Sequence, residues 1–244
     1  AYPRFSEDPT AEEIFRARVF EEPLVPIGGT PDGDQNRALA EAISTQLRTG
    51  KWDRPESFHA FLTAYPDSPW RASLLLNLGI VWRKAGFYTR ALKAWEEAWS
   101  LTKEQSDRYA RAVADRALAE WMEISVQFGR IDELQRMVTE IEGRDIGGSS
   151  GERVDVSKEG LFFFLSRHEE AIPSGPAALD RILALGNPDF VTHPKVQAFK
   201  ASHHGATITE IAALAQTVGL PMQPAYRNPG AEPPARSLLH WKLG

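Results

Sequence analysis

The sequence predicts a mainly α-helical chain in which a series of helical hairpins precedes a smaller domain that begins with helices. Apolar residues recur at spacings of three and four from Gln35 to Glu142, which is the period of an amphipathic helix. Six of the seven tryptophans lie in the same segment. Similar combinations of glycine, aromatic and small residues occur three times within it, a pattern typical of stacked repeats.

The composition limits the classes of function to consider. With 244 residues, 42% of them hydrophobic and 25% charged, the chain resembles an ordinary soluble protein of one large or two modest domains. No stretch approaches the roughly 18 uninterrupted apolar residues of a membrane span. A net charge of −5 with mixed signs argues against nucleic acid as the partner. The absence of cysteine excludes disulfides and thiolate metal sites.

Residues 1–34 form a predicted N-terminal strap. They contain five of the 17 prolines and a glycine-rich loop from Ile27 to Asp34, interrupted only by a short helical stretch from Glu12 to Phe20. The first residues show neither an initiator methionine nor the layout of a secretory signal. We therefore expect a processed or shortened N-terminus.

Residues 35–145 form the predicted repeats. The best-defined copy consists of Leu75, Leu78, Gly79, Trp82, Gly86, Tyr88, Ala91, Trp95 and Ala98. A less regular copy consists of Leu118, Trp121, Gly129, Ile131, Leu134, Val138 and Ile141, and a third of Gly50, Trp52, Phe58, Phe61 and residues 65–69. These spacings resemble the tetratricopeptide signature, in which small residues permit close approach of two antiparallel helices and aromatic residues fill the space around them. The resemblance implies a concave helical surface for a peptide or protein partner. The alternative is a plain helical bundle with large aromatic fillers.

A linker is predicted over residues 146–164, between the repeats and the last domain. The composition turns to glycine, serine and charge between Gly143 and Gly151, which marks the domain boundary. The apolar run from Leu161 to Leu165 suits either a buried strand or the end of a packing helix. We favour a helix or turn that leads into a site further along the chain.

A candidate nucleophile position lies within residues 172–179, Ile-Pro-Ser-Gly-Pro-Ala-Ala-Leu. A turn that breaks into a helix at Gly-Pro puts Ser174 at the helix N-terminus, where free N–H groups and the helix dipole stabilise negative charge. With cysteine in place of Ser174, the run resembles the nucleophile segment of the bacteriocin-processing (double-glycine leader) peptidases, a papain-like cysteine peptidase family. The alternative is a Ser-Gly-Pro turn that opens an ordinary helix.

The resemblance covers residues 165–244 and implies the helical N-terminal part of a papain-like α+β domain. It places Ser174 at the nucleophile position, and His168 at the position of the glutamine that helps to form the family's oxyanion hole. Residues 205–220, with a capping threonine and a closing glycine, are similar to the family's second helix. Residues 237–244 are similar to the strand that leads to its catalytic histidine. The chain ends where that histidine would follow, so we expect it not to cleave peptides alone.

The leading functional hypothesis, implied by the resemblance, is an inactive fragment or Cys-to-Ser variant of a bacterial papain-like cysteine peptidase. Its substrate would be a peptide segment cut during export or self-processing, and the repeats would bind that segment or a partner protein. No cofactor is expected, and an exported or envelope location is favoured over the cytoplasm. The alternative is a non-catalytic peptide- or protein-binding scaffold with a degenerate peptidase-like domain. A third hypothesis leaves function to the repeats alone, with the C-terminal part as a cap.

The remaining candidate residues are histidines. His193, His203, His204 and His240 show no i, i+4 pair that would put two metal ligands on one helix turn, so we expect loop or surface positions. His240 could instead serve as an internal base for Ser174, but its neighbour Trp241 favours a packing role. The sequence shows no Gly-rich phosphate loop and no carboxylate pair typical of glycoside chemistry.

Overall fold

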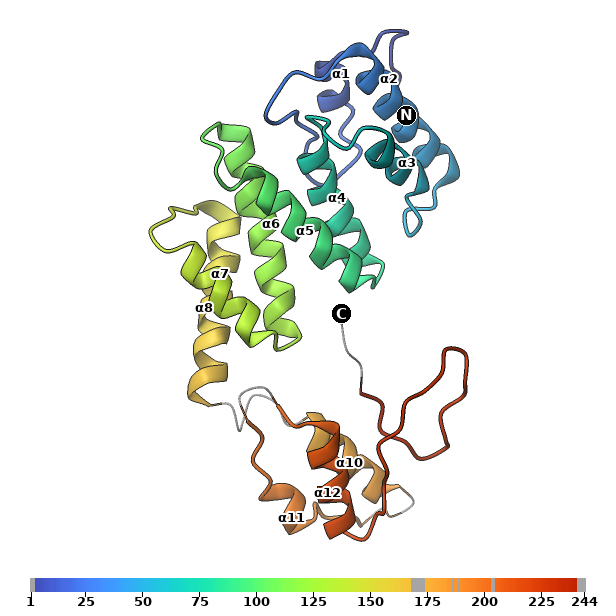
Figure 1. Cartoon of the computed structure of the whole chain (residues 1–244), viewed down its shortest axis with the longest axis vertical. Helices are drawn as coiled ribbons and strands as arrows, with labels where there is room; N and C mark the ends of the chain where they lie inside the picture. The colour runs from blue at the N-terminus through green and yellow to red at the C-terminus, as the bar shows by residue number, and fades with distance from the viewer. Residues whose placement is uncertain (1–2, 168–173, 186, 188, 203–204, 241–244) are drawn as a thin grey trace. The chain divides into compact units, whose positions relative to one another are not determined.

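The structure is a computed structural model, which describes residues 3–167, 174–185, 187, 189–202 and 205–240. These residues are mainly helical and include no strand (Figure 1), which confirms the predicted mainly α fold for this part of the chain. The helices are α1 (Ala11–Arg16), α2 (Gly33–Thr49), α3 (Glu56–Ala64), α4 (Arg71–Lys84), α5 (Tyr88–Thr102), α6 (Arg108–Gln127), α7 (Ile131–Glu140), α8 (Gly148–Ser166), α10 (Ser174–Ala184), α11 (Pro194–Gln197) and α12 (Ile208–Thr217). Residues 237–240, which we expected to begin a strand, are irregular. None of the helices in the described residues is both long and apolar enough to pass through a bilayer.

The chain divides into two compact units. The first comprises Ala1–Ile124 and Gly143–Val156, and the second comprises Ser125–Glu142 and Ser157–Gly244. Two helices, α6 and α8, therefore contribute residues to each unit. Because α8 begins at Gly148, most of the expected linker over 146–164 is helical. The run from Leu161 to Leu165 is part of the same helix, which is the structure that we favoured for it.

Helical hairpins make up most of the first unit. A left-handed glycine closes the turn after α2, where Gly50 has a φ of 65°, and the turn between α4 and α5, where Gly86 has a φ of 83°. These turns lie where the repeat spacing predicted them. The two helices of the central hairpin approach closely at Gly79, where a Cβ atom would lie only 2.2 Å from Trp95 Nε1. The close approach expected at this glycine is therefore observed.

Large apolar side chains fill the core of the first unit. Its fully buried residues include Trp70, Trp95, Phe58, Ile14, Leu39, Ile43, Leu74, Leu76, Leu78, Leu118, Met122 and Ile124. Two of the buried indole groups have hydrogen-bond partners: Trp95 Nε1–H donates to the Leu76 carbonyl at 3.2 Å, and Trp70 Nε1–H donates to Asn36 Oδ1 at 2.9 Å. These bonds offset the cost of burying the indole N–H groups.

The second unit contains α7 and the short helices α10, α11 and α12. The last three surround a small core of four buried residues, Leu179, Val196, Leu214 and Ala215. α12 begins with a capping box, in which Thr207 Oγ1 accepts the Glu210 N–H and the Glu210 carboxylate accepts the Thr207 N–H. It ends just before Gly219, whose φ is 84°. The predicted capping threonine and closing glycine are thus both present.

Candidate functional site

Ser174 is the first residue of α10, and its side chain is exposed. The next residue, Gly175, lies against α12, because a Cβ atom there would be 2.6 Å from Ile211 Cδ1. Pro176 follows in the first turn, where the missing N–H of proline costs no helical hydrogen bond. The Ser-Gly-Pro sequence therefore begins a helix and leaves the serine accessible. The nucleophile role of Ser174 stays a prediction.

The histidines give this serine no established base. His168, the expected oxyanion residue, lies outside the described residues, as do His203 and His204. His193 precedes α11, and its Nδ1 accepts the Lys195 N–H at 3.1 Å, so that this ring caps a helix. His240 is exposed in the irregular C-terminal segment. No group of three or more His, Asp or Glu side chains among the described residues could hold a metal ion.

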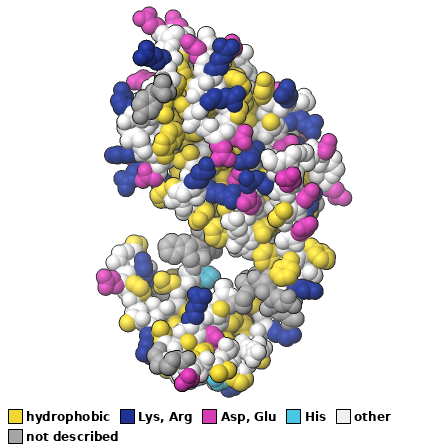
Figure 2. Space-filling model, turned by 180° about the vertical axis from the view of Figure 1, so that it is seen from behind, with side chains coloured by type: hydrophobic (Ala, Val, Ile, Leu, Met, Phe, Trp, Pro, Cys, Tyr) yellow, Lys and Arg dark blue, Asp and Glu magenta, His cyan; other side chains and the backbone are white. Residues whose placement is uncertain are grey.

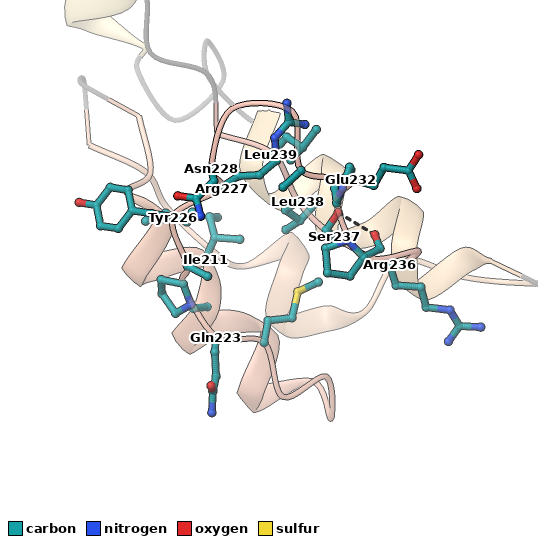
Figure 3. A pocket seen from close by; sticks show the side chains of 18 of the residues that line it. Ile211, Gln223, Tyr226, Arg227, Asn228, Glu232, Arg236, Ser237, Leu238 and Leu239 are labelled. Atoms are coloured by element: carbon teal, nitrogen blue, oxygen red, sulfur yellow. Dashed lines mark hydrogen bonds between the residues drawn. The ribbon is translucent and has the colours of Figure 1, made fainter.

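A cavity of about 500 Å³ lies between α12 and the chain from Pro221 to Leu239. Ile211 and Leu238 line it, and Leu238 also packs against the small core of this unit. Figure 3 shows that polar side chains, among them Gln223, Tyr226 and Arg236, also belong to its lining. The lining of the cavity thus mixes apolar side chains with polar and charged ones such as Asn228 and Glu232.

In the first unit, residues 21–27 of the strap run along α4 without regular secondary structure. The Glu22 N–H donates to Asn77 Oδ1 at 3.0 Å, and the Val25 N–H donates to Ser73 Oγ at 3.1 Å. Ser73 Oγ in turn donates to the Val25 carbonyl at 2.7 Å, and the Ile27 N–H donates to the Pro69 carbonyl at 2.8 Å. Two buried polar side chains of α4 thus bind the main chain of a segment about fifty residues away in sequence.

The apolar side chains of the strap are buried at the same place. Leu24 is 2% exposed and Val25 5%, so each contributes on the order of 1.5–3 kcal/mol of burial to the contact. Pro23 and Pro26 flank these two residues and carry no N–H that would need a partner. The local sequence therefore favours an extended segment with apolar side chains and few unpaired donors.

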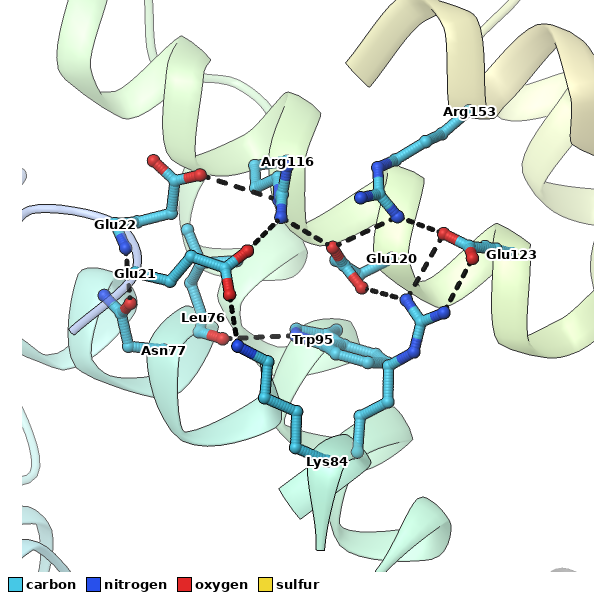
Figure 4. A network of polar contacts seen from close by, with 11 residues as sticks. Glu21, Glu22, Leu76, Asn77, Lys84, Trp95, Arg116, Glu120, Glu123 and Arg153 are labelled. Atoms are coloured by element: carbon cyan, nitrogen blue, oxygen red, sulfur yellow. Dashed lines mark hydrogen bonds and ion pairs between the residues drawn. The ribbon is translucent and has the colours of Figure 1, made fainter. Parts of the chain in front are cut away.

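A network of charged side chains joins the strap to α4, α6 and α8 (Figure 4). Glu21 pairs with Lys84 at 2.5 Å and with Arg116 at 2.9 Å, while Glu22 lies 3.7 Å from Arg116. The Arg116 guanidinium also bonds Glu120 at 2.9 Å. Acidic and basic side chains likewise lie next to one another over the face shown in Figure 2. Arg116 is therefore the residue that joins the strap to the network.

Glu120 lies at the centre of this network, and its side chain is only 3% exposed. It pairs with Arg83, with Arg116 and, at 3.5 Å, with Arg153 of α8. Glu123, one turn further along α6, binds Arg83 at 2.6 Å and also pairs with Arg153. A carboxylate this deeply buried requires such partners, because an unpaired charge would cost several kcal/mol.

Two carboxylates of the network, Glu21 and Glu123, have lowered pKa values. The hydrogen bond from Lys84 holds the pKa of Glu21 below its ordinary 4.5, and the positive charge of Arg116 acts in the same direction. Burial raises the pKa of Glu123, but the hydrogen bond and charge of Arg83, together with Arg153, outweigh it, so that this pKa also lies below 4.5. The strap is thus held by charged groups at neutral pH.

Sequence reasoning did not identify the residues of this contact. Ser73 and Asn77 are spaced four apart in a helix whose neighbouring positions are leucines, and both are almost fully buried, at 0% and 1% exposed. Two buried polar residues on one helix face are the signal that could have been followed, because such groups need hydrogen-bond partners from elsewhere in the chain. Glu120, beside the core residue Trp121, is a signal of the same kind.

Comparison of the chain with protein-family models, with curated proteins and with solved structures gives no match.

Proposed function

We propose that this chain is a peptide- or protein-binding module without catalytic activity of its own. Its helical hairpins, which resemble tetratricopeptide repeats, hold an extended segment on α4 and α6. The observation that carries the proposal is the binding of the Glu22 and Val25 N–H groups by Asn77 and Ser73. Affinity through main-chain hydrogen bonds is a common mode of peptide recognition.

The burial of these two side chains supports the proposal. A helix that served only to pack against its neighbours would favour apolar residues at such positions, because an unpaired buried amide or hydroxyl costs about 1–3 kcal/mol. Both side chains also donate to carbonyl groups of their own helix, and their oxygen atoms gain N–H donors when a segment crosses α4. Lys84 and Arg116 lie beside them and bind the carboxylates of the same segment.

A labelled synthetic peptide tests this function. The peptide Arg-Val-Phe-Glu-Glu-Pro-Leu-Val-Pro-Ile-Gly, the sequence of residues 18–28, is titrated against the full chain and against its Glu21→Gln/Glu22→Gln variant by fluorescence anisotropy. We expect saturable binding. A peptide that is N-methylated at the positions of Glu22 and Val25 loses both donors and should bind at least tenfold more weakly. N-methylation at the position of Gly28 is the control.

The proposal is wrong if the peptide binds neither protein, or if the peptide with blocked donors binds as tightly as the unmodified one. Hydrogen exchange locates the binding, because a peptide on this surface should protect α4 and not α12.

A second candidate function follows from the accessible Ser174 at the start of α10. On this proposal the chain is a Cys-to-Ser variant or inactive fragment of a papain-like cysteine peptidase that cuts a peptide segment in export or self-processing. The measured quantity is the rate at which a thiol reacts with an electrophilic peptide divided by its rate with iodoacetamide. This ratio should be higher for Ser174→Cys than for a matched control thiol.

The matched control is Ser166→Cys, because Ser166 is also exposed but ends α8, at the opposite end of a helix dipole. A helix N-terminus alone lowers the pKa of a thiol and raises both rates together. Equal preference of the two thiols for the peptide probe would contradict the peptidase proposal.

A further inference from the structure

The charges around the strap balance only when the strap is in place. Four basic residues meet four acidic residues in the network, and two of the acidic ones, Glu21 and Glu22, come from the strap. Glu120 and Glu123 of α6 engage Arg83 and Arg153. Without the strap, Lys84 loses the carboxylate that it binds, and Arg116 keeps only Glu120.

Arg116 depends on carboxylate partners whenever a segment covers it, because its side chain is only 12% exposed with the strap in place. A guanidinium in such a position is poorly hydrated and needs carboxylate partners. Lys84, in contrast, is 69% exposed and can be hydrated when it is free. The surface therefore selects for a segment that brings a carboxylate to Arg116.

We infer that residues 21–27 occupy, from within the chain, a surface that binds an acidic segment of a partner protein. That segment is extended and carries two adjacent carboxylates, followed after one residue by two apolar side chains, as Glu21, Glu22, Leu24 and Val25 do. The inference rests on the proposed function and adds how that function is regulated. Residues 21–27 and the partner compete for the same surface, so the partner binds only when residues 21–27 have left it.

The neighbouring structure allows these residues to leave while the rest of the unit stays folded. α1 packs on α2 through Ile14, which is 1% exposed, so the chain before the segment has its own anchor. After the segment come Gly28 and Gly29, which are exposed, and Gly28 has a φ of 77°. Glycine permits the backbone rotations of a hinge.

Space for a partner exists beside the segment. A cavity of about 390 Å³ is lined by residues 19–21 of the strap and by Asn77, Ile80 and Lys84 of α4. Its lining is mostly apolar, and the polar groups in it are Asn77, Lys84, Glu21 and Asp53. A partner segment can begin to bind there before residues 21–27 are fully displaced.

Competition between the two segments is measured with the labelled peptide of residues 18–28 and the full chain. The Glu21→Gln/Glu22→Gln variant weakens the internal segment and leaves the surface unchanged. The added peptide can bind only those molecules in which residues 21–27 have left the surface, so its apparent affinity falls with the fraction of molecules in which they are bound. We therefore expect the variant to bind the peptide about tenfold more tightly than the wild type. Glu7→Gln/Glu12→Gln, which changes the same net charge at exposed positions, should bind like the wild type.

The charge requirement is tested on the peptide, so that protein folding is not affected. A peptide with glutamine at both glutamate positions should bind the Glu21→Gln/Glu22→Gln variant about tenfold more weakly, and 0.5 M salt should reduce the difference between the two peptides. In the wild-type chain, saturating acidic peptide should increase the hydrogen exchange of residues 21–27.

The outcomes separate the inference from the proposed function. Equal peptide affinity of wild type and variant, with binding in both, overturns the internal competition and leaves the peptide-binding function standing. Equal affinity of the acidic and glutamine peptides overturns the acidic partner. Concentration-dependent dimerisation of the variant in light scattering, without peptide, would also overturn it, because the strap of a second copy would then be the occupant. Binding in neither protein overturns the proposed function itself.

Discussion

The two units of the chain bring their helices together in different ways. In the first, Gly79 meets the rigid ring of Trp95, and Glu120 is buried among three arginines. In the second, Gly175 meets the flexible side chain of Ile211, and the described parts of α10, α11 and α12 share a small buried cluster of Leu179, Val196, Leu214 and Ala215. A rigid contact or a buried charge cannot adjust to a change, whereas a flexible side chain can move. We therefore expect substitutions in the first unit to cost more than equivalent ones in the second.

The largest effect is expected for Glu120→Gln. Removing one partner from a buried ion-pair network leaves the other charges without compensation, at a cost of about 3–5 kcal/mol in the free energy of unfolding. Urea unfolding followed by circular dichroism measures the loss. Glu12→Gln is the control, because its pair with Arg16 has side chains 66% and 74% exposed and should contribute less than about 1 kcal/mol. Equal losses of unfolding free energy for the two variants would contradict the expectation that a buried ion pair matters more than an exposed one.

The next effect separates the two glycine contacts directly. Gly79→Ala forces a methyl group against Trp95 and should cost about 1–3 kcal/mol or more. Gly175→Ala meets Cδ1 and Cγ1 of Ile211, a side chain that can rotate, so its cost should be smaller, at about 1 kcal/mol. Gly33→Ala, at an exposed helix start where the nearest atom is 3.6 Å from the new methyl group, should be neutral. A larger loss for Gly175→Ala than for Gly79→Ala would reverse the comparison.

Two similar helix caps, one in each unit, provide a further comparison of the two units. Thr10 begins α1 and Thr207 begins α12, each in a capping box with a glutamate three residues on. Replacing either threonine with alanine should cost about 1 kcal/mol locally. Hydrogen exchange should show that Thr207→Ala exposes all of α10 to α12, because their shared core is small. Thr10→Ala should affect α1 alone, and spread of the effect into α4 would argue against this difference.

The smallest effect is a dependence on pH in the strap. The pKa of Glu21 is lowered from its ordinary 4.5, mainly by the hydrogen bond from Lys84. Its contribution is therefore fully present above pH 4.5 and is lost as the pH falls below that value through the folded-state pKa. Protection of residues 21–27, corrected for intrinsic exchange rates, should fall over this range. Glu21→Gln should remove much of this dependence of protection on pH. If the dependence is unchanged in the variant, it comes from another carboxylate.

The hairpins of the first unit could be predicted because their signals are local. Gly79 and Gly86 mark a close approach and a turn, and α4 and α5 lie where these residues indicated. The helix over most of residues 146–164 could not be predicted from composition. Glycine and serine at its start favour a loop, but Val154, Ser157 and Leu161 are buried at helical spacing, and such packing overrides weak local preferences.

The candidate site shows the same limit. The start of α10 at Ser174 follows from the Gly-Pro sequence, which acts over a few residues. The contact of the strap with Asn77 joins residues 55 positions apart, and no local pattern specifies which buried polar groups meet. What the sequence does carry is the need for a partner, since Asn77 and Glu120 are polar residues beside apolar core residues of their helices.

Pro23 and Pro26 have a consequence for the released strap. Once residues 21–27 leave α4, Leu24, Val25 and Ile27 become exposed in an extended chain, the kind of segment that readily joins the edge of a β-sheet in another molecule. Two prolines within five residues remove the donors that such pairing requires. The protein can therefore open this segment without making it a template for aggregation.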